Sequence, residues 1–121
     1  MRKILILDDA QSMRSLLAVT LKSLGFTVVE AEDGIDGLAK LKQNPDVVMI
    51  ITDLNMPKKN GVEFIRDVKA DPSFKTIPIV MLTTESEEAK KNEGKAAGAM
   101  AWIVKPFKVD NIQTVIKKII G

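Results

Sequence analysis

The stretch ILILDD, residues 4–9, places two adjacent carboxylates directly after four consecutive aliphatic side chains. A continuous aliphatic run of this length is typical of a strand covered on both faces, as in a parallel sheet. Asp8 and Asp9 repel each other, and two unit charges about 4 Å apart cost on the order of 4 kcal/mol at an effective dielectric near 20. The pair therefore predicts a compensating positive charge elsewhere in the fold.

Four further apolar runs follow the first, and amphipathic segments separate them. The runs cover residues 27–29, 47–51, 79–82 and 101–104. Met13, Leu16, Leu17, Leu21 and Leu24 form one helical stripe, and Ile112, Val115, Ile116, Ile119 and Ile120 form another. The strict alternation predicts an α/β fold, a doubly wound (βα)5 arrangement with right-handed crossovers and a five-stranded parallel sheet.

Polar residues and glycines mark where the helices should begin and end. Gly25 and Gly98 follow the first and fourth helices, where a residue with positive φ commonly ends a helix. Asp33, Asn60 and Ser86 are the expected N-caps of the second, third and fourth helices.

The chain has the composition of one soluble domain, with 121 residues, 45% hydrophobic and 28% charged. We expect a single domain over residues 1–121 without an output domain, because no linker or low-complexity segment divides the sequence. We also expect a cytoplasmic protein, because the sequence shows neither a signal peptide nor a membrane-length apolar run. The net charge of +2 is spread among mixed charges, which argues against nucleic-acid binding.

Cysteine, histidine and tyrosine do not occur in the sequence. Their absence excludes disulfides, thiolate or histidine metal sites and Ser-His or Cys-His catalysis on this chain. Any chemistry must therefore use carboxylates, hydroxyls, lysines and backbone groups.

Polar side chains follow four of the predicted strands, at the edge where ligands gather in such folds. They are Asp8 and Asp9 after the first strand, Asp53 after the third, Thr83 and Thr84 after the fourth, and Lys105 after the fifth. Clustered carboxylates suit Mg²⁺, which keeps open positions for water and phosphate oxygens. A lysine and a hydroxyl nearby can hold the other oxygens of a phosphoryl group. The set therefore predicts a magnesium-dependent phosphoryl site.

Each residue also has a simpler interpretation. Asp8 and Asp9 precede a helix, whose dipole favours acids, and Asp53 could bind local loop amides. The two threonines could be turn residues. Lys105 has no such local explanation because a cation just before a helix opposes the dipole. Pro106 stiffens the next turn and could follow a cis peptide bond.

The sequence resembles the receiver domains of two-component response regulators over essentially its whole length. The motifs that carry the resemblance are the acidic pair, D-x-x-M-P-(x)3-G from Asp53 to Gly61, the threonine after the fourth strand, and K-P-F at residues 105–107. The resemblance is greatest to the single-domain chemotaxis members. It implies a flavodoxin-like fold with sheet order 2-1-3-4-5.

The resemblance also implies roles for individual residues. Asp53 would accept a phosphoryl group from a histidine kinase, and Lys105 and the Thr83 hydroxyl would bind that group. Asp9, Asp53 and the backbone carbonyl of Asn55 would bind Mg²⁺, with Asp8 acting mainly through water. Asn55 and Glu85 occupy positions that tune phosphoryl lifetime in the family.

Trp102 departs from the family pattern, which usually has tyrosine or phenylalanine at this switch position. Trp102 could rotate inward when Thr83 moves, or it could simply cover the edge of the fifth strand. The family's usual output surface is the fourth helix, fifth strand and fifth helix, so we expect a separate protein partner to bind there.

Three functions remain open at this point. The first is a monomeric, non-enzymatic binding module controlled by phosphorylation, acting on a flagellar-motor switch protein in chemotaxis, in a phosphorelay or on another kinase. The second is a magnesium-dependent phosphohydrolase, which Asn55 disfavours because such enzymes usually have an acid there. The third is a flavin- or nucleotide-binding protein, which the glycine-free stretch DDAQSMR, residues 8–14, disfavours.

Overall fold

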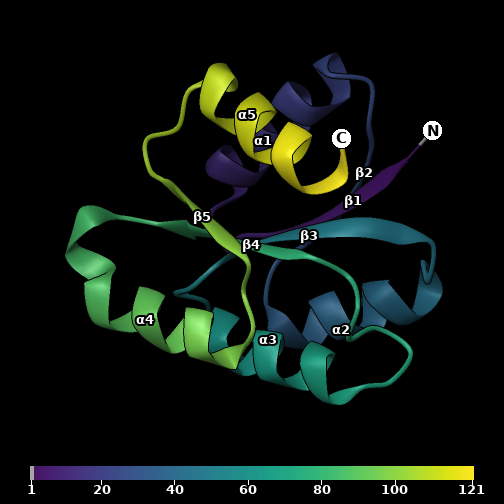
Figure 1. The fold of residues 1–121 in the computed structure, drawn as a ribbon, viewed down its shortest axis with the longest axis vertical. Helices are drawn as coiled ribbons and strands as arrows, with labels where there is room; N and C mark the ends of the chain where they lie inside the picture. Colours follow the sequence, from purple (N-terminus) through teal and green to yellow (C-terminus); the bar gives the residue numbers. More distant parts are fainter. Residues whose placement is uncertain (1) are drawn as a thin grey trace.

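The computed structural model describes residues 2–121, apart from the side chain of Glu85, so the role expected for Glu85 lies outside the described residues. In the described part, five strands alternate with five α-helices, and a short 3₁₀ helix, η1, precedes α4 (Figure 1). The elements are β1 (Lys3–Leu7), α1 (Gln11–Ser23), β2 (Thr27–Ala31), α2 (Gly34–Gln43), β3 (Val47–Asp53), α3 (Gly61–Ala70), β4 (Ile79–Thr83), η1 (Glu85–Glu87), α4 (Glu88–Ala97), β5 (Ala101–Val104) and α5 (Val109–Ile120). The sheet order β2-β1-β3-β4-β5, parallel throughout, confirms the predicted fold.

The sheet separates two hydrophobic cores. Helices α1 and α5 cover one face, and α2, α3 and α4 cover the other (Figure 1). Leu5 and Leu7 of β1 belong to the core beneath α2 and α3, whereas Ile4 and Ile6 belong to the core beneath α1 and α5. The aliphatic run is continuous because both faces of β1 are buried. None of the helices in the described residues has the length and apolar character that a membrane crossing needs.

The predicted site residues meet at the carboxyl edge of the sheet. Asp8 and Lys105 directly follow β1 and β5, while Asp53 and Thr83 are the last residues of β3 and β4. The strands predicted from the sequence end at residues 51 and 82, but the parallel ladder continues far enough to include Asp53 and Thr83. Both side chains are therefore fixed by strand geometry.

Several predicted helix boundaries are confirmed. Asp33 accepts a backbone N–H from the first turn of α2 at 2.8 Å. Asn60 and Glu63 form a reciprocal capping box at the start of α3, with both hydrogen bonds at 3.0 Å. Gly25 and Gly98 have positive φ values of 94° and 125°, as expected for residues that end helices.

Two predictions about the helices are wrong. Ser86 does not cap α4, because a capping box between Thr84 and Glu87 begins η1 earlier in the chain, and α4 then starts without a side-chain cap. Leu16 is 54% exposed rather than part of the buried stripe of α1. It lies about 100° around the helix from the buried Leu17, which turns it away from the sheet.

Candidate functional site

Three carboxylates gather at the carboxyl edge of the sheet. Asp8, Asp9 and Asp53 each offer an oxygen, and these oxygens lie within 4.8 Å of one another. Asp8 is 1% exposed and Asp53 is 4% exposed, whereas Asp9 is exposed. This carboxylate cluster confirms that the three acids predicted as metal ligands are close enough together to bind one ion.

Asp8 has an unusual environment for a carboxylate. Its Oδ1 accepts the Ala10 N–H at 2.9 Å, but Oδ2 is buried and has no hydrogen-bond partner among the described residues. Burial raises the pKa of Asp8, and the neighbouring Asp53 and Asp9 raise it further against the opposing effects of Ala10 and Lys105. A buried carboxylate oxygen that accepts no hydrogen bond and lies beside two other acids fits a divalent cation ligand.

Simple capping does not explain Asp8 and Asp9. The N-cap of α1 is Ala10, no side chain caps the helix, and its first turn contains no acid. Asp8 instead bonds the N–H of the N-cap residue itself.

Asp53 and Lys105 form an ion pair beside the carboxylate cluster. Asp53 Oδ1 accepts both the Leu54 N–H at 2.8 Å and the Lys105 Nζ at 2.9 Å. Lys105 Nζ also lies 3.8 Å from Asp8 Oδ2. Burial alone would lower the pKa of Lys105, but the hydrogen bond and charge of Asp53 outweigh it and the pKa is raised. Lys105 therefore remains an ammonium group and partly compensates the acidic charge.

Backbone contacts bring Thr83 and Lys105 together. The Lys105 N–H donates to the Thr83 carbonyl at 2.6 Å, and the Thr83 side chain is buried. The peptide bond between Lys105 and Pro106 is cis, as the sequence suggested. The hydroxyl of Thr84, the alternative residue, instead lies 2.9 Å from the Ser86 hydroxyl in η1. Thr83 is thus the more buried of the two threonines predicted after β4.

Gly61 explains why the loop after β3 needs a glycine. A Cβ atom at this position would lie 2.2 Å from the Asp53 carbonyl oxygen and 2.8 Å from Leu54 Cα. The start of α3 therefore packs directly on the backbone of the predicted phosphoryl acceptor. This close packing of α3 restricts movement of the Asp53 backbone.

Glu87 and Lys90 lie near the site and were not predicted to do so. Asn55 donates its side-chain amide to Glu87, and Lys90 donates to the Asn55 side-chain oxygen. Glu87 also accepts the Thr84 N–H at 2.7 Å. The T-x-x-E spacing of Thr84 and Glu87 is a capping-box signal that could have located Glu87. No local signal links Lys90 to Asn55.

An open hollow of about 460 Å³ lies beside the carboxylate cluster. Its lining residues are Asp9, Asn55, Met56, Pro57, Asn60 and Lys90. We refer to it as the acidic cleft. It offers a route by which a small donor or a partner side chain can approach the cluster from solvent.

Trp102 lies apart from the carboxylate cluster, on the edge strand β5. Its side chain is 41% exposed, and the ammonium groups of Lys91 and Lys95 lie 4.7 and 4.9 Å from the ring centroid. These cation–π contacts hold the indole against α4. The structure therefore places Trp102 over the edge of β5, in the outward position.

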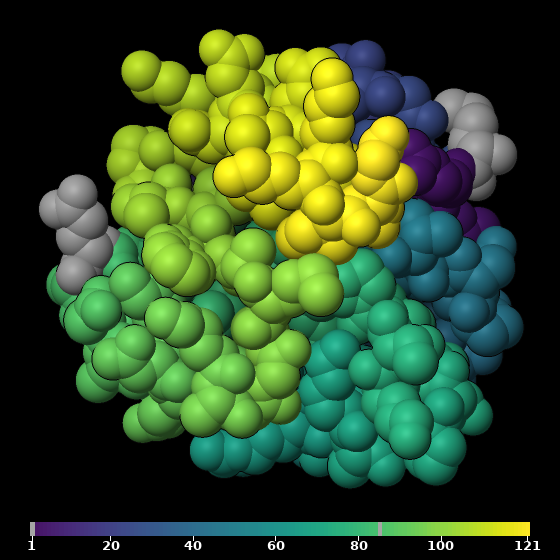
Figure 2. Space-filling view, in the orientation of Figure 1, coloured from purple at the N-terminus to yellow at the C-terminus, as the bar shows by residue number. Residues whose placement is uncertain are grey.

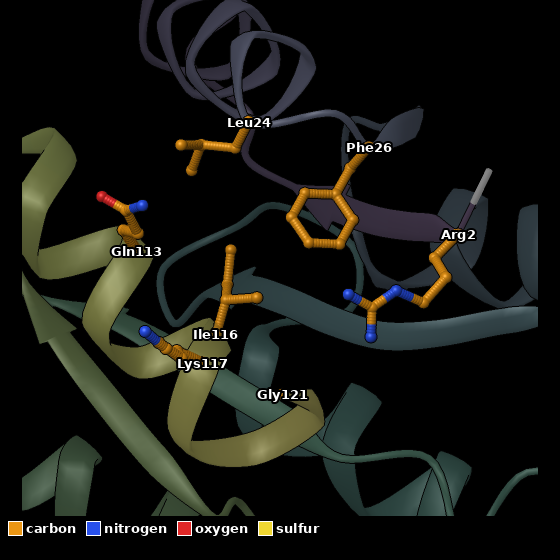
Figure 3. Close-up of a pocket in the computed structure, with 7 residues that line it drawn as sticks. All are labelled: Arg2, Leu24, Phe26, Gln113, Ile116, Lys117 and Gly121. Carbon is orange, nitrogen blue, oxygen red and sulfur yellow. The ribbon is translucent and has the colours of Figure 1, made fainter.

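A smaller cavity of about 200 Å³ lies at the opposite end of the sheet (Figure 3). Arg2 and Phe26 lie at one side of it, with the guanidinium 5.3 Å from the ring centroid, and Ile116 points toward them. Arg2 Nη1 also donates to the Ile120 carbonyl at 2.7 Å. None of the predicted site residues lines this cavity.

Comparison with known proteins agrees with this fold. Residues 4–117 match the family described as Response regulator receiver domain. The chemotaxis protein CheY1 of Helicobacter pylori strain J99 is 40% identical over 98% of this chain and 97% of its own length. The chemotaxis response regulator CheY4 of Vibrio cholerae aligns with a TM-score of 0.91 and 40% identity over 99% of both chains. The receiver domain of the sensor histidine kinase PA1611 from Pseudomonas aeruginosa PAO1, solved with a magnesium ion coordinated in the active site cleft, aligns with a TM-score of 0.91 and 25% identity over 99% of this chain and 98% of its own. The chain belongs to the response regulator receiver domain family.

Proposed function

We propose that this protein is a phosphorylation-controlled signalling module in which Asp53 accepts a phosphoryl group with the help of Mg²⁺. The observation that carries the proposal is the buried Oδ2 of Asp8, which has no hydrogen-bond partner among the described residues and lies next to Asp53. The Lys105 ammonium donates to Asp53 and lies 3.8 Å from this Asp8 oxygen. Such a site offers carboxylates to a cation and an ammonium group to a phosphoryl group.

The residues present fit a magnesium ion. Asp9, Asp53 and the Asn55 backbone carbonyl would bind the ion directly, and Asp8 would bind it mainly through a water molecule. When bound, Mg²⁺ neutralises the carboxylates and binds phosphoryl oxygens. The receiver domain of PA1611, solved with a magnesium ion in its active site cleft, supports magnesium as the ion.

In the transfer step, a carboxylate oxygen of Asp53 attacks phosphorus and forms an acyl phosphate. The P–N bond of a kinase phosphohistidine breaks, and its electron pair leaves with the imidazole nitrogen, which takes a proton from solvent. With a small acyl phosphate, the P–O bond breaks and the carboxylate leaves. Lys105 remains within reach to pair with a phosphoryl oxygen. The protein would catalyse no more than this transfer and slow hydrolysis of its own acyl phosphate.

The signal would pass through the fourth strand to a protein partner. The Thr83 hydroxyl would turn to bond a phosphoryl oxygen, and the connected backbone would move with it. Figure 2 shows α4, β5 and α5 next to one another on one face, which is the surface expected to contact the partner. Phosphorylation can shift this surface between two conformations only to the extent that the phosphoryl group interacts more favourably with one conformation than with the other.

Chemotaxis is the pathway we propose, because the chemotaxis proteins of Helicobacter pylori and Campylobacter jejuni match almost the whole chain. The donor would be a histidine kinase, and the target of the monomeric, cytoplasmic protein would be a flagellar-motor switch protein. A phosphorelay intermediate or a regulator of another kinase is the alternative, and the partner distinguishes them.

The test is intact mass after incubation with acetyl phosphate, with and without Mg²⁺. We expect a Mg²⁺-dependent gain of one phosphoryl group that Asp53→Asn abolishes. Asp110→Asn is a matched control, since Asp110 is an exposed acid in the first turn of α5. A gain that persists in Asp53→Asn would contradict the assignment of the acceptor.

A further inference from the structure

Lys90 lies at the opening of the acidic cleft, in the first turn of α4. It is the one cationic side chain among the described residues that line the cleft. A cation in the first turn of a helix is disfavoured by the helix dipole, so the helix itself gives no reason for a lysine there. The position of Lys90 calls for an explanation in terms of the cleft.

The Lys90 ammonium is held over the cleft by a chain of two side chains, Asn55 from the loop after β3 and Glu87 from η1. Lys90 donates to the Asn55 side-chain oxygen, and the amide nitrogen of Asn55 donates to Glu87. Glu87 is itself fixed, because its other oxygen accepts the Thr84 N–H at 2.7 Å. This chain orients the Asn55 amide so that its oxygen faces Lys90.

Resting on the function proposed above, we infer that Lys90 is a second phosphate contact, which captures the incoming phosphoryl donor at the opening of the cleft. Asn55 and Glu87 act as positioning residues that keep the ammonium there. The Lys105 ammonium, which is already paired with Asp53, holds the group deeper in the site.

The electrostatics of the cleft favour this role. A dianionic phosphoryl donor must approach three carboxylates, and Lys90 provides an opposite charge at the point of entry. In the resting protein Lys90 is bonded to a neutral amide oxygen. A phosphate oxygen is a stronger, charge-assisted acceptor, so the ammonium can exchange one partner for the other.

The experiment measures the second-order rate constant for phosphorylation by acetyl phosphate at saturating Mg²⁺. We expect Lys90→Met to lower this constant about fivefold, the effect of losing one exposed charge contact, and Lys90→Arg to restore most of it. The matched control is Lys95→Met, which removes the same charge from the same helix but at a residue that contacts Trp102 instead of the cleft. We expect Lys95→Met to change the constant less than twofold, because its charge is farther away and screened.

Two further measurements separate capture from a structural role. Added salt should slow the wild type more than Lys90→Met, and the dissociation constant of Mg²⁺ should not rise in Lys90→Met.

Glu87→Gln keeps an acceptor for the Thr84 N–H but removes the charge that orients Asn55, so it should lower the rate constant by about twofold.

The outcomes are distinguishable from failure of the proposed function. Equal rate constants for Lys90→Met and Lys95→Met would overturn the inference and leave Asp53 as acceptor. If the wild type takes no phosphoryl group from acetyl phosphate, the same variants are compared by the affinity of beryllofluoride with Mg²⁺, and about a fivefold loss confined to Lys90→Met supports the inference. A wild type that binds neither probe overturns both proposals.

Discussion

Helices α3 and α4 lie side by side on the same face of the sheet, yet they are held in different ways (Figure 1). The buried residues of α3 are Gly61, Val62, Phe64, Ile65 and Val68, and its start has a capping box. Among its described residues, α4 buries only Gly94, and no side chain caps its start. The comparison indicates that α3 fixes the acceptor, whereas α4 is free to respond to it.

The largest contrast is between the glycines of the two helices. Gly61→Ala would place a Cβ atom 2.2 Å from the Asp53 carbonyl oxygen, and neither backbone can move easily. We expect it to lower the free energy of unfolding by about 3 kcal/mol or more. In Gly94→Ala the new Cβ would also lie 2.2 Å from its neighbour, but that neighbour is the Met81 Sδ, a side-chain atom that can rotate away where backbone cannot, and alanine favours the helix by about 1 kcal/mol. Urea unfolding should show a change of no more than about 1 kcal/mol for Gly94→Ala, and equal losses in the two variants would contradict the comparison.

A second contrast concerns buried and exposed acids. Asp8 has a higher pKa in the folded protein than in the unfolded chain. Its contribution to stability is therefore fully present below the pKa of the unfolded chain, and it is lost as the pH rises through the pKa of the folded protein. At neutral pH without Mg²⁺, Asp8→Asn should therefore raise the free energy of unfolding by about 1 kcal/mol. Glu93→Gln, at an exposed residue of α4, is the matched control and should have no measurable effect.

Mg²⁺ should reverse which of the two variants, Asp8→Asn or Glu93→Gln, is the more stable. The ion stabilises the wild type because it binds the folded carboxylates, so the thermal midpoint should rise with Mg²⁺ in the wild type and in Glu93→Gln. The rise should be smaller in Asp8→Asn. A rise of the same size in all three proteins would show that Asp8 does not contribute to metal binding.

The smallest contrast is between the helix starts. Asn60→Ala removes the cap of α3 and should lower the free energy of unfolding by about 1 kcal/mol. Thr84→Ala removes the hydroxyl that contacts Ser86 at the start of the three-residue η1, which has little regular structure to lose, and should cost less than about 0.5 kcal/mol. Chemical denaturation of both variants provides the measurement, and a larger loss in Thr84→Ala would contradict a loosely held α4.

Much of the fold and site could be predicted because the decisive signals are local in sequence. A strand covered on both faces has a continuous aliphatic run, and parallel strands bring their carboxyl ends to one edge. Asp8, Asp53 and Lys105 could therefore be grouped from the order of the strands and the residues that follow them. Family resemblance then supplied what local patterns do not contain, namely the roles of the individual residues.

The features that escaped prediction depend on tertiary contacts. Asn55 is 32 residues from Glu87 and 35 from Lys90, so no periodic pattern reports their hydrogen bonds. Leu16 has the same apolar side chain as Leu17, and only the docking of α1 on the sheet decides which is buried. The cation–π contacts of Trp102 likewise depend on where α4 packs.

The most direct test of the account is amide hydrogen exchange in α3 and α4, with and without beryllofluoride and Mg²⁺. We expect protection in η1 and α4 to change by about tenfold, while α3 changes by less than about twofold. Thr83→Ala should still bind beryllofluoride but lose the change in α4, since the hydroxyl that draws the strand inward is gone. Equal changes in α3 and α4, or a full response in Thr83→Ala, would contradict the claim that a rigidly held acceptor signals through Thr83 to the loosely held α4.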